Sequence, residues 1–480
     1  MERRTKIVAT ISDRRCEVSF IRDLFEAGMN VVRINSAHVT PESALEVVKN
    51  VREVSDKIAI LIDTKGPEIR TTKTEVDGGY SVDKGQQLTV KGCDDGTYTT
   101  ENIIYVNYKN IVQDVPVDSS LLIDDGDIEL KVIDKNNDEL IVEVMNKGVI
   151  KSSKSLNIPN VSITLPSITE RDEVFIKWAI ENKLDFIAHS FVRRKEDVLA
   201  VQDIIDSMNS EIKIISKIEN QEGVDNIEEI LEYTYGVMVA RGDLGIEIPG
   251  EQIPIIQRSL VRKCVENKKP VIIATQMLQS MITNPRPTRA EISDIANAIY
   301  QRTDAIMLSG ETANGAYALE AVQTMDRVAK EIEKDTVTIV DVNLVRINNE
   351  ITAQLSRSAV RASLNLPVKA IVIDTLTGRT ARYLSAYRGA KTVYTVCYRK
   401  RTMRELALSY GIYPAHQEPS SSHCNFLFDS LSELEKQNKL DKEDIVVVVG
   451  GNFGSDSGAS FMEISTVLNL EQKYYFQNRK

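Results

Sequence analysis

The sequence is poor in cysteine and in long apolar runs. Its five cysteines among 480 residues are an odd number, lie far apart and include no CxxC pair, which argues against a disulfide framework and a cysteine-based zinc site. The first residues, MERRTKIVATIS, lack the continuous apolar core of a signal peptide, and no apolar run approaches the ~18 residues of a membrane span. We therefore expect a cytoplasmic protein that does not enter a membrane.

A net positive charge is also missing. The formal net charge is −11 at pH 7, which gives no long-range attraction for nucleic acid or for an anionic membrane surface. We expect neither partner, and an anionic substrate would have to be attracted by local basic residues. The 42% apolar and 27% charged residues are typical of a globular protein. A length of 480 residues is sufficient for two to four domains.

Short apolar, β-branched segments alternate with helical patterns over two long parts of the chain. This spacing predicts parallel strands joined by right-handed crossovers. Thr169 is a candidate helix N-cap, and Thr288 with Glu291 forms a capping-box pattern. Eight strands are expected, the number that closes a TIM barrel. Their segments are 6–10, 30–35, 59–66, 186–192, 213–220, 237–240, 270–277 and 305–312.

The two remaining regions differ from each other in pattern. Residues 68–167 are short alternating stretches broken by Gly-Gly, Asp-Asp-Gly and Asn-Asn-Asp turns, which predicts an inserted, barrel-like all-β domain. The catalytic barrel would then consist of residues 1–67 and 168–336. Residues 337–480 return to helix and strand alternation, which predicts a C-terminal parallel α/β domain.

The fifth expected barrel strand ends in charged residues. Lys217 and Glu219 share one face of this strand, because side chains two residues apart point the same way. The next strand ends shortly before Asp243. Two carboxylates and a lysine at neighbouring strand ends can hold a divalent cation beside an anionic substrate, and carboxylate oxygens suit Mg²⁺. These residues alone leave an alternative open, a structural ion pair with Asp243 as a helix cap.

The same pattern recurs at the ends of the other expected strands. In a TIM barrel the active site lies at the carboxyl ends of the strands. The repeated clustering therefore favours a ligand site over isolated surface charges. The residues concerned are Arg33, Asn35, Asp63, Lys217, Glu219, Asp243, Thr275 and Glu311.

Eight motifs, in this order, resemble those of the pyruvate kinase family. They are TKIVATI, GMNVVRIN, DTKGPEIR, ISKIENQEGV, MVARGDLGIEIP, ATQMLQSM, NPRPTRAE and IMLSGETA, and the resemblance covers essentially all 480 residues. It implies a glycolytic phosphotransferase that converts phosphoenolpyruvate and ADP into pyruvate and ATP, with Mg²⁺ and K⁺ as cofactors. It also implies an allosteric homotetramer.

The resemblance assigns roles to individual residues. The implied catalytic residues are Lys217, Arg33, Thr275, Arg70, Ser309 and Glu311. The implied substrate contacts are Arg33, Lys217, Gly242, Asp243 and Thr275, and the implied nucleotide contacts are Asn35, His38, Arg70 and Lys154. Mg²⁺ would be held by Glu219 and Asp243, and K⁺ by Asn35, Asp63 and Thr64.

A threonine-rich loop near the C-terminus, TLTGRT, is a candidate effector site. The hydroxyls of Thr375, Thr377 and Thr380 surround Gly378 between an apolar strand and a helix, an arrangement that suits an anion. The loop resembles the sugar-phosphate effector loop of the family and implies a phosphorylated effector. An ordinary turn with a helix cap is the alternative.

Two places depart from the family pattern, and a third residue bears on the need for K⁺. Residues 12–15, Ser-Asp-Arg-Arg, replace a loop that usually reads GPAS or similar and that lies near the nucleotide in the family. Ala37 replaces a serine that usually ligates K⁺. Glu68 occupies the position where family members independent of K⁺ tend to carry lysine. The chain therefore lacks an internal substitute for K⁺.

Two other functions are compatible with parts of the pattern. An Mg²⁺-dependent, enolate-forming lyase on a TIM barrel would use similar residues, but it would not need a β domain as a lid over a nucleotide. A catalytically degenerate paralogue that senses metabolites is supported by the altered loops alone. The presence of Lys217, Glu219 and Asp243 argues against it.

Overall fold

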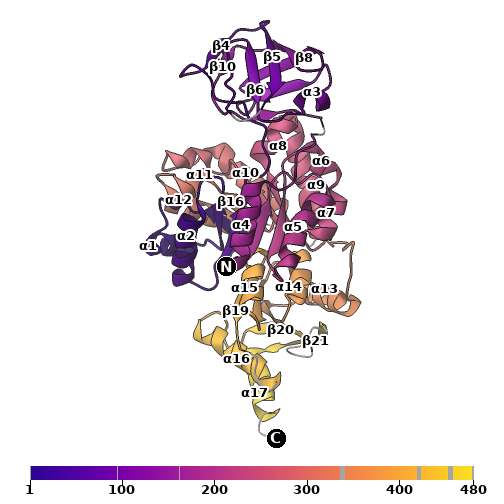
Figure 1. Ribbon diagram of the computed structural model, residues 1–480. Coiled ribbons are helices and arrows are strands. Elements are labelled where there is room, and N and C mark those ends of the chain that lie inside the picture. The colour runs from indigo at the N-terminus through magenta and orange to yellow at the C-terminus, as the bar shows by residue number, and fades with distance from the viewer. Residues whose placement is uncertain are drawn as a thin grey trace.

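A closed barrel of eight parallel strands forms the centre of the molecule (Figure 1). The predicted TIM barrel is confirmed. The computed structural model describes residues 2–93, 96–161, 163–335, 341–418, 423–451 and 458–477. Around the barrel the strands are β1 (Lys6–Thr10), β2 (Val31–Asn35), β3 (Ala59–Asp63), β12 (Phe186–His189), β13 (Lys213–Ile218), β14 (Gly236–Ala240), β15 (Val271–Ala274) and β16 (Ala305–Leu308).

Several strands are shorter than their predicted segments. β3 stops at Asp63 rather than at Gly66, and β16 stops at Leu308, before α11 (Gly310–Ala313). The polar groups that follow the strands bond to other loops instead of extending the sheet, as when Ser190 donates to the Thr64 carbonyl oxygen. The predicted segments thus included the loops that build the site.

Apolar side chains pack on both sides of the barrel wall. On β13, Ile215 packs in the barrel interior, whereas Ile214 and Ile218 pack outward beneath the helices, as alternation along a strand requires. None of the described helices is long and apolar enough to cross a membrane. The helices of the barrel region include α1 (Val18–Glu26), α2 (Pro41–Val54), α4 (Glu170–Glu181), α5 (Lys195–Ser207), α6 (Gln221–Asp225), α7 (Ile227–Tyr233), α8 (Arg241–Glu247), α9 (Ile253–Glu266), α10 (Arg289–Tyr300) and α12 (Ala318–Asp335).

Side-chain caps define the starts of two of these helices. Thr169 accepts the N–H of Asp172 at the start of α4, and Thr288 accepts the N–H of Glu291 at the start of α10. In both helices the acidic side chain accepts the N–H of its threonine in return. The predicted N-cap and capping box are confirmed.

Between β3 and α4 the chain forms a β domain at one end of the barrel (Figure 1, top). Six strands pair in the order β11-β7-β8-β9-β5-β6, β10 pairs with β4, and the domain has its own apolar core. A short helix, α3 (Ile111–Asp114), was not predicted. The strands are β4 (Tyr80–Val82), β5 (Gln87–Gly92), β6 (Ile103–Val106), β7 (Ser120–Ile123), β8 (Ile128–Lys135), β9 (Leu140–Val144), β10 (Gly148–Ile150) and β11 (Leu156–Asn157).

The C-terminal region forms a five-stranded sheet at the opposite end of the barrel (Figure 1, orange and yellow). β17 to β20 are parallel as predicted, but β21 runs antiparallel to β20. The predicted limit of this region, between residues 336 and 337, lies outside the described residues. Its elements are α13 (Glu350–Asn365), β17 (Val368–Thr375), α14 (Arg379–Ala386), β18 (Thr392–Cys397), α15 (Lys400–Glu405), β19 (Ile412–His416), α16 (His423–Lys436), β20 (Ile445–Gly451), β21 (Ala459–Thr466) and α17 (Val467–Gln477).

The C-terminal region covers the amino ends of the barrel strands. Ala407 and Leu408 pack into the core of the barrel interior. Arg388 donates to Asp304, directly before β16, with a distance of 2.9 Å between Nη1 and Oδ1. The carboxyl ends of the strands face the β domain instead, so a ligand has access there.

Candidate active site

Lys217, near the end of β13, lies at the centre of a buried cluster of charges. Its Nζ is 2.9 Å from Glu219 Oε1 and 3.1 Å from Asp63 Oδ1. It also donates a hydrogen bond of 2.7 Å to Ser190 Oγ. Burial alone would lower the pKa of Lys217, but the two carboxylates outweigh it and raise that pKa. The ammonium therefore stays charged at physiological pH.

Glu219 and Asp63 carry the negative charge of the cluster, and both are almost fully buried. Burial raises the pKa of Glu219 to about 7, an effect that Lys217 offsets only in part and that Asp243 reinforces. Burial also opposes ionisation of Asp63, but Lys217 and Arg33 outweigh it and lower the pKa of that carboxyl. A further cation beside Glu219 would relieve its burial penalty.

Arg33 extends from β2 into the same cluster. Its Nε donates to Asp63 Oδ2 at 2.6 Å, and its Nη1 donates to Thr10 Oγ1 at 3.0 Å. The guanidinium is thereby fixed between β1 and β3. Asp63 bonds to both Arg33 and Lys217, and it therefore sets the positions of the two cations relative to each other.

The oxygen atoms predicted to bind K⁺ lie at the ends of β2 and β3. Asn35 and Asp63 are direct partners in the strand register, and Thr64 follows Asp63. Asn35 Oδ1 accepts the N–H of Ala37 at 3.1 Å. The hydroxyl of Ser36 is fully buried and has no hydrogen-bond partner among the described residues. This group of oxygens fits a monovalent cation, and the Ala37 side chain adds none.

Ser190 and Phe191, directly after β12, belong to the site although they were not predicted. Ser190 accepts from Lys217 and donates to the carbonyl oxygen of Thr64 at 2.6 Å. The Phe191 N–H donates to Glu219 Oε2 at 2.7 Å. One loop thus holds both members of the Lys217–Glu219 pair. The available sequence signal was their position after a strand, because neither side chain is charged.

The start of α8 meets the end of β15 at the site. The Gly242 N–H donates to Thr275 Oγ1 at 2.8 Å, and the Arg241 guanidinium donates to the Thr275 carbonyl oxygen at 2.7 Å. Thr275 has a φ of +69°, which is rare for a β-branched residue and indicates a constrained backbone. The structure therefore brings the predicted Gly242 and Thr275 into direct contact, with Asp243 next in the chain.

Ser309 and Glu311 connect the ends of β15 and β16. Glu311 is 1% exposed, and its carboxylate oxygens accept the N–H groups of Ser309 at 2.7 Å and of Leu278 at 3.0 Å. The carboxylate therefore holds two segments of backbone beside the site.

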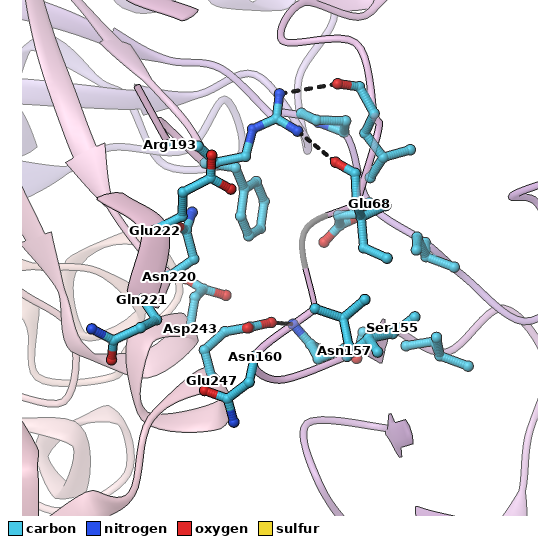
Figure 2. A pocket seen from close by; sticks show the side chains of 18 of the residues that line it. Glu68, Ser155, Asn157, Asn160, Arg193, Asn220, Gln221, Glu222, Asp243 and Glu247 are labelled. Carbon is cyan, nitrogen blue, oxygen red and sulfur yellow. Dashed lines mark hydrogen bonds between the residues drawn. The ribbon is translucent and has the colours of Figure 1, made fainter. Parts of the chain in front are cut away.

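A cavity of about 610 Å³ lies between the barrel and the β domain (Figure 2). Its wall includes Asp243 and Glu247 of α8, and Asn157 on the side of the β domain donates to Glu247 at 3.1 Å. Phe191, which bonds to Glu219, also lines it, so the cavity adjoins the Lys217 cluster. The volume is in the range of roughly 300–1,000 Å³ that is usual for sites of small molecules and cofactors.

The three remaining predicted nucleotide contacts lie in two regions. Arg70 and Lys154 lie on adjacent antiparallel segments at the base of the β domain. Arg70 Nε donates to Glu68 at 2.8 Å, and Lys154 Nζ lies 2.8 Å from Asp124 Oδ1. His38 is exposed on the loop after β2. The structure thus brings Arg70 and Lys154 together, while His38 belongs to the barrel.

The altered loop of residues 12–15 is bonded to the segment after β16. Ser12 Oγ donates to the carbonyl oxygen of Ala313 at 2.8 Å, and Arg15 donates to that of Gly315 at 3.0 Å. The Arg15 guanidinium also lies 4.1 Å from the centre of the Phe20 ring. The loop therefore has defined contacts, although its sequence departs from the family pattern.

The TLTGRT loop has the predicted position between β17 and α14. Thr375 Oγ1 accepts the Gly378 N–H at 2.9 Å, and Gly378 has a φ of +79° at the start of α14, a conformation that favours glycine. The described residues around this loop enclose a cavity of only about 20 Å³. Effector binding, which would require this space to open, stays a prediction.

The carboxylates beside the cluster suit a partial Mg²⁺ site. No three His, Cys, Asp or Glu side chains gather as a metal site in the part of the chain that the structure describes. Mg²⁺ is commonly bound by one or two protein carboxylates, with water and phosphate oxygens in the other positions. Glu219 and Asp243, whose charges interact, fit such a partial ligand set.

Comparisons with known proteins match the chain over nearly its whole length. The profile described as "Pyruvate kinase, barrel domain" matches residues 2–322, and "Pyruvate kinase, alpha/beta domain" matches residues 353–465. A pyruvate kinase from Borreliella burgdorferi is 46% identical over 468 residues, which cover 96% of this chain and 97% of that protein. One from Bacillus licheniformis is 44% identical, with 98% of this chain and 82% of that protein covered. The crystal structure of a pyruvate kinase from Cryptosporidium parvum, 33% identical, gives a TM-score of 0.91 and covers 97% of this chain and 96% of its own.

Proposed function

Because the chain belongs to the pyruvate kinase family, we propose that the charged cluster at the carboxyl ends of its barrel strands is the site of phosphoryl transfer. The chain is a phosphotransferase that converts phosphoenolpyruvate and ADP into pyruvate and ATP. The observation that best supports this location is the buried Lys217 ammonium between Glu219 and Asp63.

The residues of the cluster have different proposed roles in phosphoryl transfer. An oxygen of the ADP β-phosphate bonds to the phosphorus of phosphoenolpyruvate, and the bond from phosphorus to the enolate oxygen breaks. Lys217 neutralises charge on the transferring group, and Arg33 binds its oxygens. Asp63 already holds both cations in place, so little reorganisation accompanies the reaction.

The substrate carboxylate is proposed to bind at the start of α8. Its donors are the N–H groups of Gly242 and Asp243 and the Thr275 hydroxyl, and the contact between Gly242 and Thr275 supports this grouping. The enolate then takes a proton on carbon to give pyruvate. Thr275, Ser309 and Glu311 are the proposed proton-delivery network, in which Glu311 positions the Ser309 backbone.

Two cations are proposed to bind beside the cluster. The family generally uses a divalent metal and K⁺. Glu219 and Asp243 would hold Mg²⁺, which would supply positive charge to the reacting phosphoryl group. The near-complete burial of Glu219 supports this assignment, because a bound cation would offset the cost of burying its charge. Asn35, Asp63 and Thr64 would hold K⁺, a role supported by their position at adjacent strand ends.

The remaining assignments rest on the family resemblance. The nucleotide contacts are proposed to be Asn35, His38, Arg70 and Lys154, and the phosphorylated effector is proposed to bind Thr375, Thr377, Gly378 and Thr380. We further propose a cytoplasmic homotetramer. The proposed domains are the barrel at 1–67 and 168–336, the β lid at 68–167 and the C-terminal domain at 337–480.

A coupled assay of pyruvate formation tests the activity and separates the alternatives. With phosphoenolpyruvate, ADP, Mg²⁺ and K⁺ we expect pyruvate and ATP in equal amounts, and no pyruvate when ADP is omitted. Enolate chemistry that proceeds without ADP would identify a lyase. No product under any of these conditions would identify a degenerate paralogue, and either result would contradict the assignment.

A further inference from the structure

A second cavity, of about 370 Å³, opens at the amino ends of the barrel strands, the opposite end from the proposed site of phosphoryl transfer. It lies where β13, β14 and β15 begin, next to the C-terminal region. Its volume is within the range of roughly 300–1,000 Å³ that is usual for small-molecule sites. Its wall includes the charged side chains of Lys213, Lys269, Glu211 and Glu232 and the aromatic ring of Tyr233.

Lys269 is a largely buried cation that lacks an anionic partner among the described residues. Its Nζ donates to the carbonyl oxygen of Thr234 at 2.6 Å. Burial, together with the neighbouring cations Arg382, Arg346 and Lys268, lowers the pKa of Lys269 to about 8. An uncompensated buried charge is costly, and an anionic ligand would remove that cost.

Arginines lie near both carboxylates in the wall. Glu211 lies 3.8 Å from Arg399 and 3.9 Å from Arg401. Glu232 pairs with Arg346. Neither carboxylate forms an ion pair with Lys269, and the arginines beside them place further positive charge around the cavity.

Lys213 supplies a second cation to the wall. It pairs only loosely with Glu405 of the C-terminal region, at 3.9 Å, and its side chain is 33% exposed. Such a distance is longer than that of a charge-assisted hydrogen bond, about 2.7–2.9 Å. Lys213 can therefore turn toward a ligand without the loss of a strong contact. Tyr233, which is 44% exposed, offers an aromatic surface in the same wall.

We propose that this cavity binds a small phosphate monoester, with the phosphoryl group between Lys269 and Lys213 and the organic part against Tyr233. A phosphoryl group carries roughly −1.5 to −2 charges at pH 7 and three acceptor oxygens, which match two ammonium groups. The volume exceeds that of the phosphoryl group alone and leaves space for a small organic part. Neither lysine belongs to the proposed site of phosphoryl transfer, so the proposal does not depend on it.

Site-resolved lysine labelling tests the proposal without an activity readout. Trace acetylation with acetic anhydride, followed by mass spectrometry, reports Lys269 and Lys268 separately. Lys268 is a matched control, because burial also lowers its pKa to about 8, yet it bonds to the Arg346 carbonyl oxygen and does not line this cavity. We expect glycerol 3-phosphate at about ten times its half-saturating concentration to slow labelling of Lys269 about tenfold, because only about one site in ten is then unoccupied. Labelling of Lys268 should not change.

Variants and a second probe define the outcomes. Protection of Lys269 should weaken severalfold in Lys213→Gln and persist in Thr375→Ala, which alters the separate effector loop. Glycerol 3-phosphate should protect at lower concentration than inorganic phosphate, because inorganic phosphate has no organic part to contact Tyr233. Equal protection by the two probes would overturn the monoester assignment. Protection of Lys268 to the same degree, no protection of Lys269, or full protection in Lys213→Gln would overturn the proposed site.

Discussion

Lys217 Nζ lies 2.9 Å from Glu219 Oε1, and the second oxygen of Glu219 is held by the Phe191 N–H at 2.7 Å. The two residues are separated by one position at the end of β13, and they share a face of the strand. One strand end therefore supplies both the cation proposed for the transferring phosphoryl group and a carboxylate proposed for Mg²⁺.

Removal of the Glu219 charge should raise the requirement for Mg²⁺. Glu219→Gln keeps the shape and the acceptor oxygen but loses the anionic ligand. Changes in the outer shell of metal sites already cost 10–100-fold in affinity, so we expect half-saturation to rise at least about tenfold. The measurement is a rate titration in Mg²⁺. Glu247→Gln, which changes a carboxylate in the wall of the adjoining 610 Å³ cavity, is the matched control. An unchanged half-saturation in Glu219→Gln would exclude Glu219 as a ligand.

Activity should require K⁺, with a weaker affinity than in members that have a serine at the position of Ala37. Glu68 supplies no internal cation, and it pairs with Lys65 and Arg70. If the missing ligand costs about 1 kcal/mol, comparable to one net hydrogen bond, K⁺ affinity is lower by roughly fivefold. A rate titration in K⁺ on a Na⁺-free background should show this gain in Ala37→Ser.

A companion variant tests whether the neighbouring hydroxyl already fills this role. Ser36 Oγ is buried without a partner among the described residues. We expect that it does not replace the missing serine, so Ser36→Ala should leave K⁺ half-saturation unchanged. A higher half-saturation in this variant would identify Ser36 as the substitute ligand. Full activity without K⁺ would contradict the argument from Glu68. The same half-saturation in Ala37→Ser as in the wild type would contradict the argument from the missing ligand.

The TLTGRT loop should respond to a phosphorylated effector. Its glycine, hydroxyls and helix start suit an anion, although Leu376 stands where some activated family members carry lysine. Titration with a panel of sugar phosphates and nucleoside monophosphates should change the activity or the melting temperature for at least one compound. Thr380→Ala should weaken that response. No response to any compound would favour an ordinary turn with a helix cap.

His189 should stay neutral to unusually low pH. It is fully buried, neither ring nitrogen has a hydrogen-bond partner among the described residues, and burial lowers its pKa to about 4. The pKa of histidine is about 6.5 in an unfolded chain, so the shift to about 4 corresponds to roughly 3 kcal/mol of folding free energy. This contribution to stability is complete above pH 6.5 and is lost as the pH falls toward 4.

Nuclear magnetic resonance of the histidine rings measures this directly, because the chain has only four histidines. The ring signal that disappears in His189→Leu should show no protonation above pH 5. The stability of this variant should also depend less on pH between 6.5 and 4. Protonation of the His189 ring near pH 6.5 would contradict the buried, unpaired state.

The parts of the fold that could be predicted depend on local pattern. The barrel strands were visible as apolar segments, and their polar ends marked Lys217, Glu219 and Asp243 in advance. Helix starts such as Thr288 could be predicted because the capping contacts span three residues. These signals lie within a few positions of the residues that they identify.

Contacts between distant segments could not be predicted in the same way. Arg388 and Asp304 are 84 positions apart, and only the packing of the C-terminal region under the barrel brings them together. Ser190 follows a strand end as an uncharged residue, and its bond to Lys217 depends on the register of β12 and β13. The antiparallel direction of β21 depends on its pairing with β20 and not on its composition.

The most direct test of the assigned activity is phosphorus-31 magnetic resonance of the reaction with the wild type and with Lys217→Met. Methionine keeps much of the lysine stem but removes the charge at the transferring group, and such electrostatic effects are worth ~3 kcal/mol or more, about 100-fold in rate. Phosphorus-31 resonance should show the phosphoenolpyruvate signal converted into that of the ATP γ-phosphate by the wild type. In Lys217→Met this conversion should slow at least about 100-fold while phosphoenolpyruvate still binds. A variant within about threefold of the wild-type kcat, well below the effect expected for a lost charge, would contradict the central role of Lys217.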